Sequence, residues 1–160
     1  MSIVSSWRIV SLFLLVIAGV AAWWPVVSVS DTTSEHLVVS FFDVGQGDAI
    51  HIATPDGYEM LIDGGPSAKV LQELSNRRSF FDREIDVVVA THPDTDHVSG
   101  LVDVLQRYQV NLLLETAAEH DAPAAIAYSS AALIEGAHIV SAQAGQVLKL
   151  GASTTVEILS

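Results

Sequence analysis

The sequence predicts an α/β domain with a mixed sheet, preceded by a separate apolar segment at the amino terminus. Short β-rich runs come first and then alternate with segments of helical spacing, an order that is typical of layered α/β domains. Half of the 160 residues are apolar and only 16% are charged, so the composition favours a filled core over disorder. The length suits one domain with a short appendage.

Charge and cysteine content limit the function classes. The formal net charge of −12 argues against a protein that coats nucleic acid passively, because an acidic surface repels phosphate backbones. It does not exclude an enzyme that acts on an anion, since a bound metal ion overrides the surrounding field. The sequence has no cysteine, so any metal must be bound by His, Asp and Glu.

The first 30 residues are expected to form a membrane anchor or a signal peptide. Residues 9–24 are almost wholly apolar, close to the roughly 17 residues that a spanning helix needs. Arg8 precedes the stretch and acidic residues follow it, so the positive-inside rule places the amino terminus in the cytoplasm and the rest outside. The alternatives are cleavage after Ser28-Val29-Ser30 and a buried core helix. We expect an extracytoplasmic protein, anchored by residues 9–27 or secreted.

After a polar linker at residues 31–36, the folded domain is expected over residues 37–160. Strands are predicted over residues 37–44, 48–54 and 58–63, split by the Gly45-Gln46-Gly47 and Pro55-Asp56-Gly57 turns. Then follow a helix over 67–75, a strand over 85–90, a helix over 98–108, a strand over 110–114, a helix over 122–134 and strands over 138–141, 146–150 and 154–159. The last strand has no covering helix after it, so we expect a domain that is cut short.

A dense group of metal-ligand side chains follows the strand predicted over residues 85–90. His92, Asp94, Asp96 and His97 lie within six residues, and burying them unpaired would cost on the order of several kcal/mol each. In an extended loop His92 and Asp94 point to one side, while Asp96 and His97 fall on the following turn and reach a second position. The pattern predicts two metal ions, Zn²⁺ or alternatively Mn²⁺ or Fe.

A solvated acidic turn is the alternative interpretation of this group. Asp94 and Asp96 would then only cap the following helix, a common role for Asp. The upstream His92, the apolar strand before it and Ser99-Gly100 after it favour the metal site.

The pattern His-x-Asp-x-Asp-His after a strand resembles the metal-binding motif of metallo-β-lactamase-fold hydrolases. The runs FDVGQGDA at residues 42–49 and LIDGG at residues 61–65 are similar to the first motifs of one branch. That ComEC-like branch contains the hydrolase domain of the bacterial competence protein ComEC, a DNA-uptake channel. The resemblance covers about residues 37–115 and implies an αββα sandwich, of which this chain holds the amino-terminal half.

The resemblance also implies a role for each residue of the motif. His92 and Asp94 would hold the first metal, and Asp96 and His97 the second. Asp96 would in addition be the catalytic residue that orients the attacking hydroxide, and Asp63 would fix the ligand loop. The commoner family pattern has His at the position of Asp94, a departure that changes metal preference more than it removes the site.

Three further residues are candidates for a rim around the metals, namely Asp43, Gln46 and Asp48. The alternative is a tight bend with both carboxylates in solvent. Among the remaining histidines we expect His36, His51 and His138 to be surface or satisfied residues, and His120 to be a weaker candidate for the site.

The family completes its site with a further His, a bridging Asp and a last His from the second half of the domain. None of these is recognisable after Leu114. Four ligands for two ions leave the site under-coordinated, because zinc takes about four ligands each.

Three functions follow from these patterns. The first is a ComEC-like metal-dependent hydrolase that acts on a phosphodiester such as DNA outside the cytoplasm. The second is a catalytically incomplete binding or assembly module, whose domain a partner chain completes. The third is a hydrolase of small esters or lactams.

Overall fold

A computed structural model describes residues 11–19, 35–79, 81–116 and 121–159. The chain divides into two compact units, Met1–Asp31 and Thr32–Ser160. In the first unit residues 11–19 are helical, and the large apolar side chains of residues 12–17 are all exposed. The rest of the predicted segment over residues 9–27 lies outside the described residues, as does most of the linker at 31–36. Within the described ranges no helix is both long enough and apolar enough to cross a membrane.

The second unit has the α/β fold with a mixed sheet that the sequence predicts. Its elements are β1 (Val38–Phe41), β2 (Ile50–Ala53), β3 (Glu59–Ile62), α2 (Lys69–Ser75), β4 (Glu84–Ala90), α3 (Thr95–Arg107), β5 (Gln109–Glu115), α4 (Pro123–Glu135), β6 (His138–Ser141), β7 (Val147–Leu150) and β8 (Thr154–Glu157). Strands β1 to β6 form one six-stranded sheet in chain order, and β7 pairs with β8 in a second sheet. The pairs β1–β2 and β2–β3 are antiparallel, whereas β3, β4, β5 and β6 run parallel.

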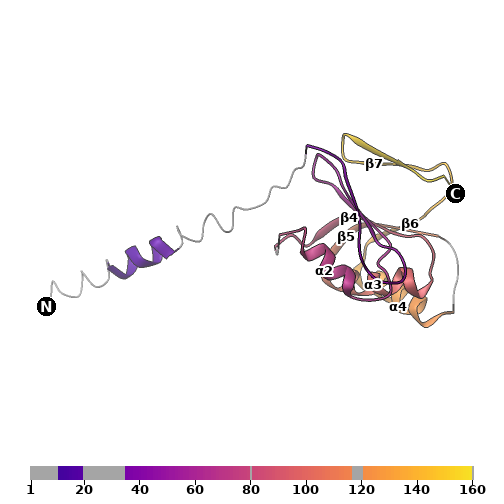
Figure 1. The fold of residues 1–160 in the computed structure, drawn as a ribbon, viewed down its shortest axis with the longest axis horizontal. Coiled ribbons are helices and arrows are strands. Elements are labelled where there is room, and N and C mark those ends of the chain that lie inside the picture. The colour runs from indigo at the N-terminus through magenta and orange to yellow at the C-terminus, as the bar shows by residue number, and fades with distance from the viewer. Residues whose placement is uncertain (1–10, 20–34, 80, 117–120, 160) are drawn as a thin grey trace. The chain divides into compact units, whose positions relative to one another are not determined.

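The two faces of the large sheet have different cover. Helices α2, α3 and α4 lie on one face and the β7–β8 hairpin on the other (Figure 1). On the helical face Leu61, Val88 and Leu113 of the sheet are fully buried against apolar helix residues. On the opposite face Met60 and Val87 pack with Leu150 of β7. Successive residues of β3 and β4 thus pack alternately on the two faces, and both faces take apolar side chains, as in strands covered on both sides.

Two element boundaries differ from the sequence prediction by three residues, and the others by at most two. Strand β1 ends at Phe41 rather than at residue 44. Phe42 still donates to the Ala49 carbonyl at 2.9 Å, but Phe42 and Val44 are buried in the core as part of a loop. Helix α3 begins at Thr95 rather than near Val98. Its buried residues start only at Val98, so the apolar spacing could not reveal the polar first turn.

One carboxylate fastens the β7–β8 hairpin to the large sheet. Asp56, in the turn between β2 and β3, accepts hydrogen bonds from the backbone N–H of Ala152 and from the Ser153 hydroxyl, the latter at 3.0 Å. Hydrogen bonds from Thr54 and from the Ala152 backbone lower the pKa of Asp56 to about 2. The ionised carboxylate is therefore the form that holds the hairpin.

Candidate metal centre

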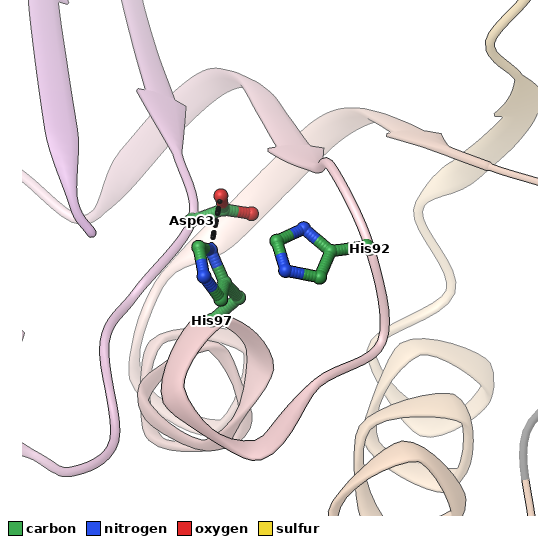
Figure 2. A group of neighbouring side chains, drawn as sticks. All are labelled: Asp63, His92 and His97. Atoms are coloured by element: carbon green, nitrogen blue, oxygen red, sulfur yellow. Dashed lines mark hydrogen bonds and ion pairs between the residues drawn. The ribbon is translucent and has the colours of Figure 1, made fainter. Parts of the chain in front are cut away.

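The predicted site residues gather at the carboxyl ends of two parallel strands. Ile62 of β3 lies beside Val89 of β4, so Asp63 and the Thr91-His92 pair follow neighbouring strand ends. In open α/β sheets ligands bind outside such strand ends. Figure 2 shows Asp63, His92 and His97 facing one another at this edge, with His97 on the first turn of α3.

Asp63 is the buried centre of this arrangement. Its side chain is only 4% exposed, and its backbone has a φ of 58° in the left-handed region, where Asp is tolerated better than most residues. One carboxylate oxygen accepts from the Thr91 N–H at 2.9 Å. The other accepts from the Thr91 hydroxyl at 2.6 Å and from His97 Nδ1 at 2.8 Å. A carboxylate accepts only, so Nδ1 of His97 carries a proton, and in the neutral ring Nε2 keeps its lone pair.

His92 is oriented by the same carboxylate through Thr91. The Thr91 hydroxyl donates its single proton to Asp63, so its oxygen accepts from His92 Nδ1, 2.9 Å away. The rings of His92 and His97 lie with their centroids 3.8 Å apart. In the neutral form of each imidazole the proton is therefore on Nδ1 and Nε2 is the acceptor, which is the form that binds a metal.

Asp94 and Asp96 stand beside the two Nε2 atoms. Asp94 Oδ2 lies 3.7 Å from His92 Nε2, and Asp96 Oδ2 lies 4.0 Å from His97 Nε2. Asp94 occupies the N-cap position of α3 but makes no side-chain capping hydrogen bond. Asp94 thus stands at the cap position that the alternative interpretation gives it, but without a capping bond, and its carboxylate is 61% exposed and available to a ligand.

The residues present fit a divalent ion. One donor atom each from Asp63, His92 and His97 lies within 4.8 Å of the others, a group that does not include Asp94 or Asp96. Both Asp63 oxygens already accept hydrogen bonds from Thr91 and His97. Imidazole with carboxylate is a donor set that suits zinc. Two ligands of one tetrahedral zinc lie about 3.3 Å apart, given bonds of roughly 2.0–2.1 Å. The His92–Asp94 and His97–Asp96 separations are slightly wider than this. The assignment of these four residues as metal ligands stays a prediction, and the geometry is compatible with it.

The residues suggested for a rim lie on the loop between β1 and β2. Asp43, Gln46 and Asp48 are all exposed. Asp43 pairs with Lys69 at 3.1 Å, and the carbonyl of Asp48 accepts from the N–H of Gly65 at 3.0 Å. That backbone bond ties the rim loop to the turn that carries Asp63.

The other histidines lie apart from this group or outside the described residues. His51 is buried, stacks on Phe42 and has Nε2 3.6 Å from a Glu59 oxygen. His36 and His138 are exposed, as expected for surface residues. His120 lies outside the described residues.

Sequence reasoning missed a second polar pair at the same edge of the sheet. Glu115 ends β5 beside Ala90 of β4, and its carboxylate accepts a hydrogen bond from the buried Tyr128 hydroxyl at 3.1 Å. Burial first, and then the negative charges of Glu115 and Asp63, raise the pKa of Tyr128 far above its usual value. Tyr128 is therefore a neutral donor at every physiological pH. No spacing pattern marks a tyrosine in an Ala-rich helix for this role.

Comparison with models of protein families shows which family the chain belongs to. The model of the metallo-beta-lactamase superfamily matches residues 42–157, which include every motif described above. The chain belongs to the metallo-beta-lactamase superfamily. It therefore has the fold of metal-dependent hydrolases, and its superfamily implies a divalent metal, for which Asp63, His92 and His97 form a possible site.

Several solved structures are also similar to the chain. The Rm3 metallo-beta-lactamase has 18% identity and a TM-score of 0.47, with 71% of this chain and 45% of that chain covered. Zn²⁺-bound PqqB from Methylobacterium extorquens has 18% identity and a TM-score of 0.49, with 71% and 42% covered. The protein YhfI from Bacillus subtilis has 16% identity and a TM-score of 0.45, with 72% and 47% covered. The chain thus spans less than half of the length of these structures. No curated protein matched the sequence.

Proposed function

We propose that this chain provides the metal-binding part of a ComEC-like hydrolase that cleaves a phosphodiester, such as DNA, outside the cytoplasm. The observation that carries the proposal is the pair His92 and His97. Both Nδ1 atoms are engaged, directly or through Thr91, by Asp63, and both Nε2 atoms stand beside a carboxylate oxygen. The motifs at residues 42–49 and 61–65 support the choice of branch.

Each residue has a separate role in this proposal. His92 with Asp94 would hold one ion, and His97 with Asp96 the other, both most simply zinc, with manganese or iron as alternatives. When bound, such ions supply Lewis acidity and hydroxide at neutral pH. Asp63 holds the two rings in orientation, and Asp96 accepts a hydrogen bond from the attacking water.

The charge of the chain makes substrate binding depend on the metal. The net charge is −12, and Asp43, Asp48 and Asp94 are exposed on the loops of the site. An anionic substrate is repelled by this edge until divalent ions reverse the local field. We therefore expect phosphodiester binding itself, as well as cleavage, to require metal.

Hydrolysis assays with added Zn²⁺ or Mn²⁺ test the proposal. The substrates are single-stranded DNA, a bis-nitrophenyl phosphodiester, a nitrophenyl ester and a β-lactam. We expect phosphodiester cleavage that His97→Ala and Asp96→Asn abolish and that His138→Ala, on the exposed β6 strand, leaves unchanged. Cleavage of the ester or the β-lactam alone would assign the chain to another branch. Metal binding without any hydrolysis would favour the second candidate.

The second candidate is a catalytically incomplete module that a partner chain completes. Large apolar side chains on α4 face solvent in this chain: Ile126, Leu133 and Ile134 are 57%, 76% and 87% exposed. Phe41 on β1 is 77% exposed. Joined in one patch, such side chains would suit a surface that another polypeptide covers. Measurement of the mass of the chain in solution, alone and with candidate partners, separates this module from a monomeric enzyme.

The extracytoplasmic location is proposed from the amino-terminal segment. Residues 9–24 are almost wholly apolar, and Arg8 precedes them. Protease treatment of intact spheroplasts tests it. Degradation of the domain from outside is expected, and protection of the domain would contradict it.

A further inference from the structure

Three backbone segments at the edge of the sheet that carries the candidate metal centre are hydrogen-bonded directly to one another. The N–H of Gly64 donates to the carbonyl of His97 at 2.8 Å, and the N–H of Gly100 donates to the carbonyl of Gly65 at 2.9 Å. The N–H of Gly65 in turn donates to the carbonyl of Asp48 at 3.0 Å. The rim loop, the Asp63 turn and the start of α3 are thus joined without the use of side chains.

Gly47 brings the rim loop into contact with the metal ligand Asp96. A Cβ atom on Gly47 would overlap the carbonyl oxygen of Asp96, and it would lie 2.8 Å from the carbonyl carbon and 3.0 Å from Cβ of the same residue. Real Cβ contacts are essentially never so short against backbone atoms. Any side chain at position 47 must therefore move the backbone of Asp96 or lift the rim loop away from it.

Gly45, two residues earlier, is a matched comparison, because it shares the backbone conformation of Gly47 but not its contact with Asp96. Gly45 has a φ of 94° and Gly47 a φ of 95°, so a substitution at either position meets the same left-handed strain. A Cβ on Gly45 would meet no atom within 4 Å. Of the two positions, only position 47 also has a neighbour that leaves no room for a side chain, and that neighbour is the predicted metal ligand Asp96.

We propose that Gly47 is a positioning residue of the metal centre. Its bare backbone lets the rim loop rest against the backbone and Cβ of Asp96, and so fixes the position from which the Asp96 carboxylate reaches to 4.0 Å from His97 Nε2 before an ion arrives. The inference rests on the proposed metal centre and adds a function for the Gly45-Gln46-Gly47 turn, which the roles of the ligands leave unused. Ligands that are ordered in advance lose less conformational freedom when they bind, so the contact between Gly47 and Asp96 should raise metal affinity.

The test compares Zn²⁺ affinity, by competition with a chelating dye, and the visible absorption of the Co²⁺-loaded chain for Gly47→Ala and Gly45→Ala. We expect Gly47→Ala to weaken Zn²⁺ binding about ten- to a hundredfold, the range for residues that orient metal ligands, and to change the Co²⁺ spectrum. Gly45→Ala should keep the Zn²⁺ affinity within about threefold of that of the unchanged chain, because it does not touch a metal ligand. It should also leave the Co²⁺ spectrum unchanged. Circular dichroism establishes that each chain is folded.

A second variant guards against misfolding of Gly47→Ala. One extra glycine inserted between Gly45 and Gln46 slackens the loop without adding a side chain, and it should weaken Zn²⁺ binding in the same way. Equal affinity and spectrum for the unchanged chain and the folded variants would overturn the positioning role alone. Failure of the unchanged chain to bind Zn²⁺ would overturn the proposed metal centre, and the inference with it.

Discussion

At the scale of single residues, Asp63 organises the site although it comes from a different strand than the predicted metal ligands. Its buried carboxylate accepts three hydrogen bonds, two from Thr91 and one from His97. A buried carboxylate is stable only when it is paired in this way. The pairing determines which nitrogen of each imidazole is left for a metal.

Asp63→Asn tests this role with little change in shape. Asn tolerates the left-handed backbone of position 63, but its NH₂ group cannot accept from Thr91 or from His97. We expect Zn²⁺ affinity to fall about ten- to a hundredfold, and the free energy of unfolding to fall by about 1–3 kcal/mol. Dye competition and urea denaturation measure the two quantities. Asp121→Asn, at an exposed position, is the control, and equal losses in both variants would contradict the role of Asp63.

The residues of the site differ in how far sequence predicts them. His92, Asp94, Asp96 and His97 are contiguous, so their spacing alone marks them, and Asp63 is marked by the glycines after it. Thr91, Glu115 and Tyr128 have ordinary local surroundings. They become part of one edge only when β3, β4 and β5 pair in register, which local sequence does not specify.

At the scale of elements, helix α3 is held against the Asp63 turn by a glycine inside the helix. A Cβ on Gly100 would overlap the carbonyl oxygen of Gly64 and lie 2.7 Å from that of Ser67. Glycine usually weakens a helix interior by about 1 kcal/mol relative to alanine. Here the close approach outweighs that preference, so the element is placed by packing rather than by propensity.

Gly100→Ala should therefore destabilise the chain although alanine is the better helix former. The overlap forces α3 away from the Asp63 turn, and we expect a net loss of about 1–3 kcal/mol in the free energy of unfolding. Urea denaturation measures it. Gln106→Ala, on the exposed side of the same helix, should change stability by no more than about 0.5 kcal/mol. A stabilising Gly100→Ala would show that the contact is not tight.

The β7–β8 hairpin should loosen in acid. Its anchor Asp56 has a pKa lowered from 3.8 to about 2, so the contribution of the ionised carboxylate is present above 3.8 and is lost as the pH falls towards 2. We expect hydrogen-exchange protection of the Ala152 amide, measured by NMR, to fall in that window. In Asp56→Asn the protection should be lower throughout and without this pH dependence. Constant protection in the unchanged chain would exclude Asp56 as the anchor.

Sequence also predicts elements unevenly. The order of strands and helices follows from the apolar patterns, and the boundaries of α4 and β6 lie within a residue of those expected. The contact between the hairpin and the turn at Asp56 joins residues almost a hundred positions apart, so no local pattern reports it.

At the scale of the whole molecule, an acidic chain presents an edge where imidazoles and carboxylates converge. The chain has a net charge of −12, and cations bound at this edge should stabilise its folded state. They relieve the repulsion among Asp94, Asp96 and the rim carboxylates. A ligand that binds only the folded state stabilises it by about 2.7 kcal/mol at a hundred times its dissociation constant. We therefore expect Zn²⁺ to raise the unfolding temperature of the chain and EDTA to reverse the shift.

Metal content tests the central claim most directly. The full chain and a His92→Ala/His97→Ala variant are purified in parallel and analysed for zinc, manganese and iron by elemental mass spectrometry. A His36→Ala/His138→Ala variant is the control for the loss of two exposed histidines. We predict near-stoichiometric metal in the unchanged and control chains and its loss from the His92→Ala/His97→Ala variant. Metal in the unchanged chain no higher than in that variant would contradict the account.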